Sequence, residues 1–466
     1  MSIRRTKIIC TIGPATNSYE KLEALYHAGM NVVRLNMSHA DHEGAARIIN
    51  WIKTLNRKVR YPVPVMLDTQ GPEIRTGEVN EPMNLKNGDV VTVSVRAGDV
   101  ETRSIRIDYE ELVEVLEVGN RLTVDNGLIN FEVLEKNGHQ LVCRVIDGGT
   151  LGSKKHVNLP GIRVNLPAIT AKDRFDIQFG LEHDVDFIAL SFVRTAEDIH
   201  ELRELLGSKV NNVKVIAKIE DQEGVTNVHE IVQAADGVMV ARGDLGIETD
   251  IADLPNVQRR IVHASALYGK RSIVATHLLE SMIENPIPTR AEVTDVANAI
   301  YEGVDAVMLS GETSVGAHPV RCVAQLHEIA LRSERWPGLG YEKELVADND
   351  KQHIAVNAVA LAEDIEAKGI VVITRRGIIA DLVTNARPQR VPVYAFTNHS
   401  QTRRRLAINR AVFSHRIEFS SEPEKTLQRA LSILREREGM NVGDKLIVIS
   451  DVLAEKNSDA IQLRYL

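Results

Sequence analysis

The sequence predicts an α/β protein in which a (β/α)8 barrel of the TIM type carries an inserted small β-barrel-like lid domain and a C-terminal open α/β domain. Eight short apolar runs alternate with helical stretches on the two sides of one interruption. The interruption is rich in two-residue turn signals, and a segment with Pro and Gly (336–344) precedes the last αβ region. A doubly wound open sheet is the main alternative, because a strand count does not prove closure.

The apolar runs predict the barrel strands in order. Polar and apolar residues do not alternate along them, which is typical of parallel strands buried on both faces. Helical periodicity over 18–28 and 42–55 supplies the first two covering helices. The runs centre on Ile8, Val32, Val65, Phe187, Val215, Val238, Ile273 and Val307.

The other segments follow from turn signals and linkers. Residues 1–70 and 167–335 form the two parts of the barrel domain, and 71–166 form the inserted β domain, where Asn-Gly and Gly-Gly pairs indicate hairpins. Residues 345–466 form the C-terminal domain, with strands predicted in GIVVIT, VPVYAFT and DKLIVIS.

Composition excludes several function classes. The 466 residues contain 56 Lys and Arg against 64 Asp and Glu, a net charge of −8, and only 4% aromatic residues. A nucleic-acid partner is therefore not expected, because neither a basic field nor stacking platforms are present. The sequence has no long apolar span and no signal peptide, so we expect a cytoplasmic location and no membrane partner. Cys10, Cys143 and Cys322 predict reduced core thiols.

Polar side chains gather where the predicted barrel strands end. In such barrels the catalytic groups come from the carboxyl ends of the strands. These ends carry Arg34, Asn36, Ser38 and His39 on the second strand, Asp68 and Thr69 on the third, Lys218 and Glu220 on the fifth, Arg242 and Asp244 on the sixth, Thr276 and His277 on the seventh, and Ser310 and Glu312 on the eighth.

The spacing of these residues suggests paired action. Residues i and i+2 of a strand share a face, so we expect Lys218 with Glu220, and Arg242 with Asp244, to project together. Two carboxylates on adjacent strands, Glu220 and Asp244, suit Mg²⁺. Lys218 and Arg34 would then face the anionic groups of a substrate.

Structural explanations compete with each of these functional ones. The Lys218–Glu220 and Arg242–Asp244 pairs are also consistent with plain salt bridges. Asn36, Ser38 and Thr69 are residue types that cap helices, and single histidines are often structural. The sequence contains no P-loop, H-E-x-x-H, G-x-S-x-G or protein-kinase catalytic-loop motif. Convergence of several groups on one face is what favours a catalytic site.

Several long motifs resemble those of the pyruvate kinase family. They are TKIICTIGPAT (6–16), NVVRLNMSH (31–39), LDTQGPEIRTG (67–77), VMVARGDLGIE (238–248), NPIPTRAEVTDVANAI (285–300) and DAVMLSGET (305–313). The resemblance implies transfer of the phosphoryl group of phosphoenolpyruvate to ADP in glycolysis, giving pyruvate and ATP. It also implies Mg²⁺ or Mn²⁺, a K⁺ requirement, an inserted domain that acts as a lid and a homotetramer.

The resemblance also implies residue roles. Glu220 and Asp244 would hold Mg²⁺, while Lys218 and Arg34 would stabilise the phosphoryl group in flight. The other implied roles are a K⁺ site formed by Asn36, Ser38, Asp68 and Thr69; a substrate-carboxylate site at Ala241, Arg242 and Gly243; enolate protonation through Thr276 with a relay of Ser310 and Glu312; and nucleotide contacts from Asn36, His39, Arg75 and Lys155.

Some positions depart from the family pattern. Gln70 stands where many relatives have Lys, and His277 stands where Gln is usual. The loop after the first C-terminal-domain strand reads TRRGIIA (374–380) in place of a Ser/Thr-rich phosphate loop. We therefore predict that fructose 1,6-bisphosphate is not the activator. Arg375 and Arg376 suggest another phosphorylated effector, although two solvated arginines are an equally good explanation.

Two other functions are consistent with the residues alone. A Mg²⁺-dependent barrel lyase uses a similar carboxylate pair, and Lys218 would then be a Schiff-base nucleophile. A catalytically silent metabolite sensor is the other, although retention of Lys218, Glu220, Asp244 and Thr276 argues against it. Borohydride trapping with a keto acid separates the lyase from an ADP-dependent enzyme.

Overall fold

The computed structural model describes residues 3–79, 81–95, 104–162, 164–450 and 460–466. Its central domain is a closed barrel of eight parallel strands, so the predicted barrel is confirmed and the doubly wound open sheet is wrong. The strands are β1 (Lys7–Thr11), β2 (Val32–Asn36), β3 (Val65–Asp68), β13 (Phe187–Leu190), β14 (Lys214–Ile219), β15 (Gly237–Ala241), β16 (Arg271–Ala275) and β17 (Ala306–Leu309). Around the barrel they are ordered β1-β17-β16-β15-β14-β13-β3-β2.

Helices cover the outside of the barrel, and side-chain caps fix where several of them begin. Ser18 accepts a hydrogen bond from the amide of Lys21, and Thr170 and Asp173 form a capping box. The helices are α1 (Tyr19–Ala28), α2 (His42–Leu55), α4 (Ala171–Glu182), α5 (Ala196–Leu206), α6 (Gln222–Thr226), α7 (Val228–Ala234), α8 (Arg242–Glu248), α9 (Leu254–Leu267), α10 (Arg290–Tyr301), α11 (Gly311–Ser314) and α12 (Pro319–Ser333), with 3-10 turns η1 (Gly207–Lys209) and η2 (Glu280–Ile283).

Two apolar cores hold the barrel domain together. The outer core fills the space between strands and helices, with fully buried residues such as Leu22 and Ile188. The inner core contains Ile9, Met66 and Phe187, so the barrel is packed and is not a pore. Ile408 from the C-terminal domain belongs to this inner core and closes the barrel at its amino-terminal end. The three cysteines are buried free thiols, as predicted.

The inserted domain is built from antiparallel hairpins. Its described strands form a seven-stranded sheet ordered β4-β12-β8-β9-β10-β6-β7 and a two-stranded sheet of β5 and β11. The elements are β4 (Ile74–Arg75), β5 (Met83–Leu85), β6 (Val90–Ser94), β7 (Ser104–Arg106), α3 (Leu112–Val115), β8 (Arg121–Val124), β9 (Ile129–Asn137), β10 (Gln140–Asp147), β11 (Gly149–Leu151) and β12 (His156–Asn158). At the β9–β10 turn Gly138 has φ +60°, a conformation that favours glycine.

The C-terminal domain is an open sheet of five strands in the order β20-β19-β18-β21-β22. Two of these strands, β20 and the antiparallel edge strand β22, were not predicted. The elements are η3 (Tyr341–Glu344), α13 (Asp350–Asp364), β18 (Gly369–Ile373), α14 (Ile378–Asn385), β19 (Val393–Thr397), α15 (Ser400–Arg405), η4 (Leu406–Ile408), β20 (Val412–Arg416), α16 (Pro423–Glu438), β21 (Lys445–Ser450) and β22 (Ala460–Tyr465).

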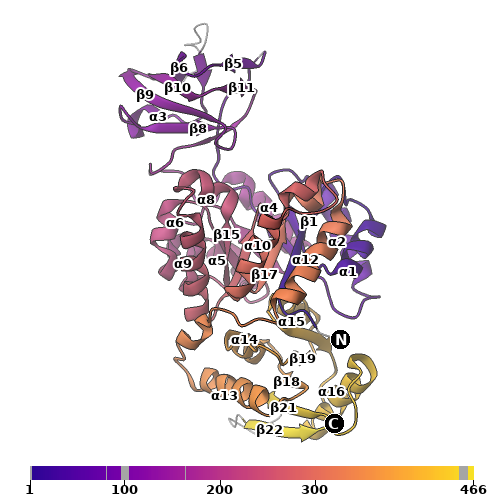
Figure 1. The fold of residues 1–466 in the computed structure, drawn as a ribbon. Coiled ribbons are helices and arrows are strands. Elements are labelled where there is room, and N and C mark those ends of the chain that lie inside the picture. Colours follow the sequence, from indigo (N-terminus) through magenta and orange to yellow (C-terminus); the bar gives the residue numbers. More distant parts are fainter. Residues whose placement is uncertain (1–2, 80, 96–103, 163, 451–459) are drawn as a thin grey trace.

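The inserted domain and the C-terminal domain lie at opposite ends of the barrel (Figure 1). The insertion leaves the barrel after β3 and therefore stands over the carboxyl ends of the strands. At the other end Lys7 donates a hydrogen bond of 2.6 Å to the carbonyl of Val412, and Arg404 pairs with Asp186 at 2.8 Å. No helix in the described part of the chain is both long and apolar enough to cross a membrane.

Candidate active site

Four charged side chains meet at the carboxyl ends of β2, β3 and β14. The Asp68 carboxylate binds two cations, with Arg34 Nε 2.6 Å from Oδ2 and Lys218 Nζ 3.0 Å from Oδ1. Lys218 Nζ also lies 3.1 Å from Glu220 Oε1. All four residues are at least nine-tenths buried, so the cations and carboxylates compensate one another in a medium where lone charges are costly.

The strands determine this convergence. Parallel pairing of β2 with β3 sets Arg34 opposite Met66 and Asn36 opposite Asp68. Arg34 is held from the other side by Thr11, whose Oγ1 accepts a hydrogen bond of 3.0 Å from Nη1. Lys218 is the fifth residue of β14, and Glu220 follows the last residue of that strand. The short distance between Lys218 and Glu220 fits both the salt-bridge and the functional interpretation of this pair.

The expectation for Arg242 and Asp244 is wrong. Strand β15 ends at Ala241 and helix α8 begins at Arg242, so the two side chains do not share a strand face. At about 100° per residue a helix turns them roughly 200° apart. Arg242 instead donates 2.8 Å to Asp295 and 3.2 Å to the carbonyl of Ala275, which also excludes the plain Arg242–Asp244 bridge.

Asp244 faces Glu220, and the two carboxyl groups perturb each other. Burial raises the pKa of Glu220, and the neighbouring Asp244 raises it further, against the opposing effect of Lys218. Burial also raises the pKa of Asp244. Paired carboxyl groups that resist ionisation favour a cation between them.

Lys218 keeps its charge in the cluster. Burial alone would lower the pKa of Lys218, but the Asp68 and Glu220 carboxylates raise it above its ordinary value. For Asp68, burial alone would raise the pKa, while Arg34 and Lys218 lower it below its ordinary value. The cluster therefore presents a charged ammonium beside an ionised carboxylate.

The donor set at Glu220 and Asp244 fits Mg²⁺. This ion takes one or two protein carboxylates and leaves its other positions to water and substrate oxygens. The described residues contain no cluster of three or more His, Cys, Asp or Glu side chains that could hold a metal. A pair of carboxylates suits an ion that keeps a partly open coordination sphere.

The predicted set of oxygen donors at β2 and β3 is brought together only in part. Asn36 and Ser38 are neighbours, since Asn36 Oδ1 accepts a hydrogen bond of 3.2 Å from the Ser38 amide. Both oxygens of Asp68 already bind cations. Thr69 Oγ1 accepts 3.1 Å from the Ser191 amide and donates to the carbonyl of Ala189. None of the three hydroxyl or amide residues caps an α-helix in the structure.

Thr276 lies in strained backbone at the end of β16. Its φ is +66° and that of His277 is +54°, conformations that β-branched and bulky residues rarely adopt. Thr276 Oγ1 donates 2.6 Å to the carbonyl of Ala275 and accepts 2.8 Å from the amide of Gly243. The Gly243 amide is therefore engaged by Thr276 in this structure, and His277 is exposed.

Glu312 joins the ends of β16 and β17. One carboxylate oxygen accepts a hydrogen bond from the Leu279 amide at 3.0 Å and the other accepts from the Ser310 amide at 2.8 Å. Burial raises the pKa of Glu312, against these hydrogen bonds. The Ser310 hydroxyl is buried and has no hydrogen-bond partner among the described residues. An unpaired hydroxyl beside Glu312 is available to a ligand or water.

The predicted nucleotide contacts lie on different elements. His39 is exposed in the turn that follows β2. Arg75 pairs with Glu73 at 2.5 Å, and Lys155 pairs with Asp125 at 2.8 Å. Arg75 lies on β4, and Lys155 directly precedes β12, which pairs with β4 at the base of the inserted domain. The structure therefore places Arg75 and Lys155 on the paired strands β4 and β12 or directly beside them, and His39 on the barrel.

Three residues were missed by the sequence reasoning. Ser191 Oγ accepts 2.6 Å from Lys218 Nζ, and the amide of Phe192 donates 2.7 Å to Glu220 Oε2. Asp173 on α4 accepts from the amides of Gln70 and Gly71, both at 3.1 Å, and so positions the loop after Thr69. The rule of polar strand ends would have found Ser191, which directly follows β13. Asp173 had no local signal beyond its capping box.

Comparisons with known proteins place the chain in one family. The family model "Pyruvate kinase, barrel domain" matches residues 3–323, and "Pyruvate kinase, alpha/beta domain" matches residues 352–462. The chain is 40% identical to "Plastidial pyruvate kinase 2" of Arabidopsis thaliana, covering 96% of this chain and 78% of the relative. It is 41% identical to "Pyruvate kinase" of Geobacillus stearothermophilus, covering 96% and 78%, and 39% identical to "Pyruvate kinase" of Clostridium perfringens, covering 96% of each.

Proposed function

The chain belongs to the pyruvate kinase family of phosphotransferases, and on that premise we propose that it transfers the phosphoryl group of phosphoenolpyruvate to ADP. The observation that carries the proposal is the Asp68 bracket, defined as Asp68 with the Arg34 and Lys218 cations on its two oxygens. Phosphoryl transfer asks a protein chiefly for alignment and for neutralisation of charge. A guanidinium and an ammonium held side by side on one carboxylate supply both.

The two cations of the bracket would bind the moving phosphoryl group. Arg34 offers planar donors for phosphate oxygens, and Lys218 offers a compact charge. Because Ser191, Asp68 and Glu220 surround Lys218 Nζ, the ammonium is fixed before substrate arrives. Such preorganisation costs no rearrangement when negative charge develops on the phosphoryl oxygens.

Glu220 and Asp244 would hold Mg²⁺, or Mn²⁺ in its place. Either ion, when bound, neutralises the charge of the substrate oxygens that it contacts. For K⁺ we propose the oxygens of Asn36, Ser38, Asp68 and Thr69, supported by the register that pairs Asn36 with Asp68. These assignments also explain why acidic side chains crowd a site for anionic substrates.

Thr276 would help to deliver the proton that converts the enolate to pyruvate. Its hydroxyl lies between the Ala275 carbonyl and the Gly243 amide. At the end of the neighbouring strand β17, the Glu312 carboxylate accepts a hydrogen bond from the Ser310 amide. General acid catalysis of this kind needs a hydroxyl fixed within reach of the reacting carbon or of one bridging water. We propose a relay from Glu312 and Ser310 to Thr276. The backbone of Ala241, Arg242 and Gly243 would receive the substrate carboxylate.

The nucleotide would bind between the barrel and the inserted domain. Asn36 and His39 approach from the barrel, and Arg75 and Lys155 approach from the base of the inserted domain. Closure of that domain over the barrel end would exclude water from the transfer. The domain's position over the carboxyl ends of the strands supports a lid (Figure 1).

A lyase that forms a Schiff base on Lys218 is not favoured. The ammonium lies within 3.1 Å of two carboxylates, which raise its pKa. A nucleophilic amine needs the opposite shift. The deciding assay measures pyruvate formation with and without ADP, Mg²⁺ and K⁺. ADP-independent conversion, together with borohydride trapping of a keto acid on Lys218, would contradict the proposed transfer.

A phosphorylated effector other than fructose 1,6-bisphosphate would bind the C-terminal domain. Arg376 lines a cavity of about 290 Å³ between this domain and the barrel, together with Lys270 and Arg405. Lys214 also lines this cavity but pairs there with Asp236 and Asp381. Arg375 lies elsewhere, 5.8 Å over the ring of Phe419. Gathered cations favour a phosphate ligand.

Kinetics with AMP and a panel of sugar phosphates test this assignment. We expect Arg376→Ala to weaken activation and the matched control Arg375→Ala to leave it unchanged. Strong activation by fructose 1,6-bisphosphate would contradict the proposal. Homotetramer assembly, which light scattering measures, and a cytoplasmic location stay predictions.

A further inference from the structure

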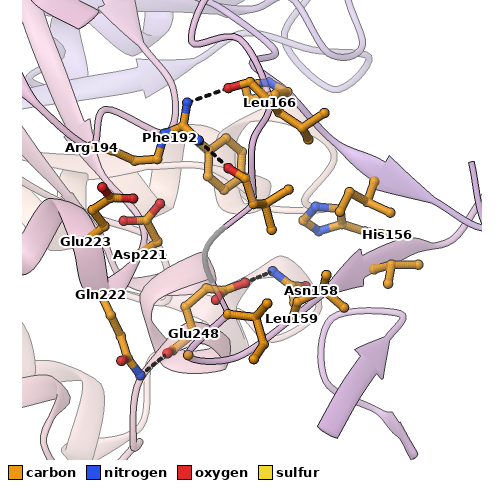
Figure 2. A pocket seen from close by; sticks show the side chains of 16 residues that line it. His156, Asn158, Leu159, Leu166, Phe192, Arg194, Asp221, Gln222, Glu223 and Glu248 are labelled. Atoms are coloured by element: carbon orange, nitrogen blue, oxygen red, sulfur yellow. Dashed lines mark hydrogen bonds between the residues drawn. The ribbon is translucent and has the colours of Figure 1, made fainter. Parts of the chain in front are cut away.

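A second cavity lies at the junction of the inserted domain and the barrel (Figure 2). Its volume is about 290 Å³, which is enough for a small organic molecule. Its walls come from both linkers of the inserted domain and from the barrel loops after β13 and β14. The apolar lining consists of Pro72, Ile74, Val157, Leu159, Ile162, Val164, Leu166 and Phe192.

This cavity at the junction, which we call the hinge cavity, differs from the proposed nucleotide site. Ile74 and His156 line it, whereas Arg75 and Lys155, the next residues in sequence, are not among its lining residues. Strand alternation explains the difference for β4, because successive side chains point to opposite faces. The hinge cavity therefore lies behind the strand pair that would contact ADP.

One buried polar group in the hinge cavity has an unused oxygen. Asn158 is only 3% exposed, and its amide nitrogen donates 2.7 Å to Glu248 Oε1. Its Oδ1 has no hydrogen-bond partner within the part of the chain that the structure describes. Buried amide oxygens are almost always paired, so this oxygen indicates a missing donor.

The polar side of the cavity is acidic. Asp221 and Glu248 line it, and Figure 2 shows both carboxylates beside the apolar wall. Burial raises the pKa of Glu248 to about 7, and Asp221 raises it further against the Asn158 hydrogen bond. A cation would relieve the cost of keeping Glu248 ionised.

Arg194, the arginine that lines the cavity, already donates hydrogen bonds within the protein. Arg194 donates 2.7 Å to the carbonyl of Val164 and 2.5 Å to that of Leu166, so its guanidinium clamps the second linker to the barrel. The clamp fixes one wall of the cavity and leaves Glu248 without a basic partner among the described residues.

We propose that the hinge cavity binds a small organic cation, a primary amine on an apolar body, with the ammonium between Glu248 and the free oxygen of Asn158. The apolar body packs against Leu159, Ile162 and Phe192. An ammonium supplies the donor that Asn158 lacks and the charge that the carboxylates favour. A carboxylate or phosphate ligand is disfavoured by the same groups.

Such a ligand would contact the active site indirectly. Phe192, whose φ is +51°, presents its ring to the hinge cavity while its amide donates to Glu220. Asp221 directly follows Glu220 in sequence. Because both linkers also form the cavity wall, an occupant would hold the inserted domain at the angle seen here.

Calorimetric titration of the full chain with benzylamine, without substrates at pH 8, tests the proposal. We expect binding to the unmodified protein, with benzyl alcohol and benzoate at least about tenfold weaker. Glu248→Gln keeps the Asn158 hydrogen bond and removes the charge, so benzylamine affinity should fall about tenfold or more. Glu135→Gln, at an exposed site on β9, is the matched control and should change nothing.

A second variant tests binding in the cavity without changing its charge. Ile162→Trp places a larger ring in the cavity from a partly exposed position, and it should abolish benzylamine binding. Hydrogen exchange of the amides of 156–159 should slow when benzylamine is bound to the unmodified protein. No detectable benzylamine binding, equal binding of benzyl alcohol, or binding unchanged by both Glu248→Gln and Ile162→Trp would overturn the proposal. Because no substrate is present, failure here says nothing about phosphoryl transfer.

Discussion

Replacement of Lys218 by Met is the sharpest perturbation of the proposed site. The substitution removes the ammonium and keeps a side chain of similar length. The structure places this ammonium 2.6 Å from Ser191 Oγ, 3.0 Å from Asp68 and 3.1 Å from Glu220. Loss of one preorganised donor to developing charge costs about 10² to 10³ in turnover, or about 2.7–4 kcal/mol of transition-state stabilisation.

The same substitution also weakens the fold, because Glu220 loses its only cation among the described residues. Breaking a buried ion pair by removing one partner costs about 3–5 kcal/mol. Arg34 still neutralises Asp68, so we expect the lower part of that range. Urea denaturation followed by circular dichroism measures this loss, while a coupled assay of pyruvate formation measures turnover at saturating Mg²⁺.

A double variant separates the two effects of Lys218→Met. Adding Glu220→Gln removes the unpaired charge, so stability should recover while turnover stays low. If Lys218→Met alone retains turnover within about tenfold of the unmodified protein, the transition-state role of Lys218 is refuted. If the double variant does not recover stability, the ion-pair explanation of the stability loss is refuted instead.

Two further predictions concern neighbouring groups. Thr276→Val keeps a β-branched side chain at the strained position and removes the hydroxyl. The rate at which pyruvate methyl protons exchange in D₂O, measured by NMR, should therefore fall about 10²-fold or more. An unchanged exchange rate would exclude the proton relay. Because the pKa of Glu248 is raised to about 7, benzylamine affinity should fall as the pH drops from 8 to 6 and Glu248 takes up a proton. Asp221, Glu223, Arg194 and His156 also line the cavity, Asp244 lies near Glu248, and burial lowers the pKa of His156. The pH dependence should therefore be much weaker in Glu248→Gln.

The barrel was predictable because its strands are buried on both faces. Each strand therefore reads as an unbroken apolar run, and eight such runs with helices between them leave few arrangements. The strands missed in the C-terminal domain lack this signal. Strand β20 contains Ser414, His415 and Arg416, and β22 is a half-exposed edge strand, so neither produces a continuous apolar run.

The active site was predictable wherever a strand extends to the polar residue itself. This condition holds for Arg34 on β2 and Lys218 on β14. It fails at Arg242 and Asp244, because strand β15 ends at Ala241 and both residues lie on helix α8. Helix α8 sends Arg242 to Asp295, a partner 53 positions away, which no local pattern indicates.

Asp68 shows why residue types alone do not assign roles at such a site. The family resemblance implies that it is an oxygen donor for K⁺, and in the structure each of its oxygens binds a cation of the chain. The carboxylate therefore fixes the spacing of Arg34 and Lys218, since the two nitrogens must approach opposite oxygens of one planar group. A K⁺ ion beside Asp68 would compete with both side chains for the same negative charge. It would thereby weaken the attraction of Asp68 for the two cations and make the electrostatic potential at a bound phosphate more positive. The two assignments of Asp68 would then be compatible, and a bound K⁺ would act on the phosphate electrostatically through the positive potential around Asp68.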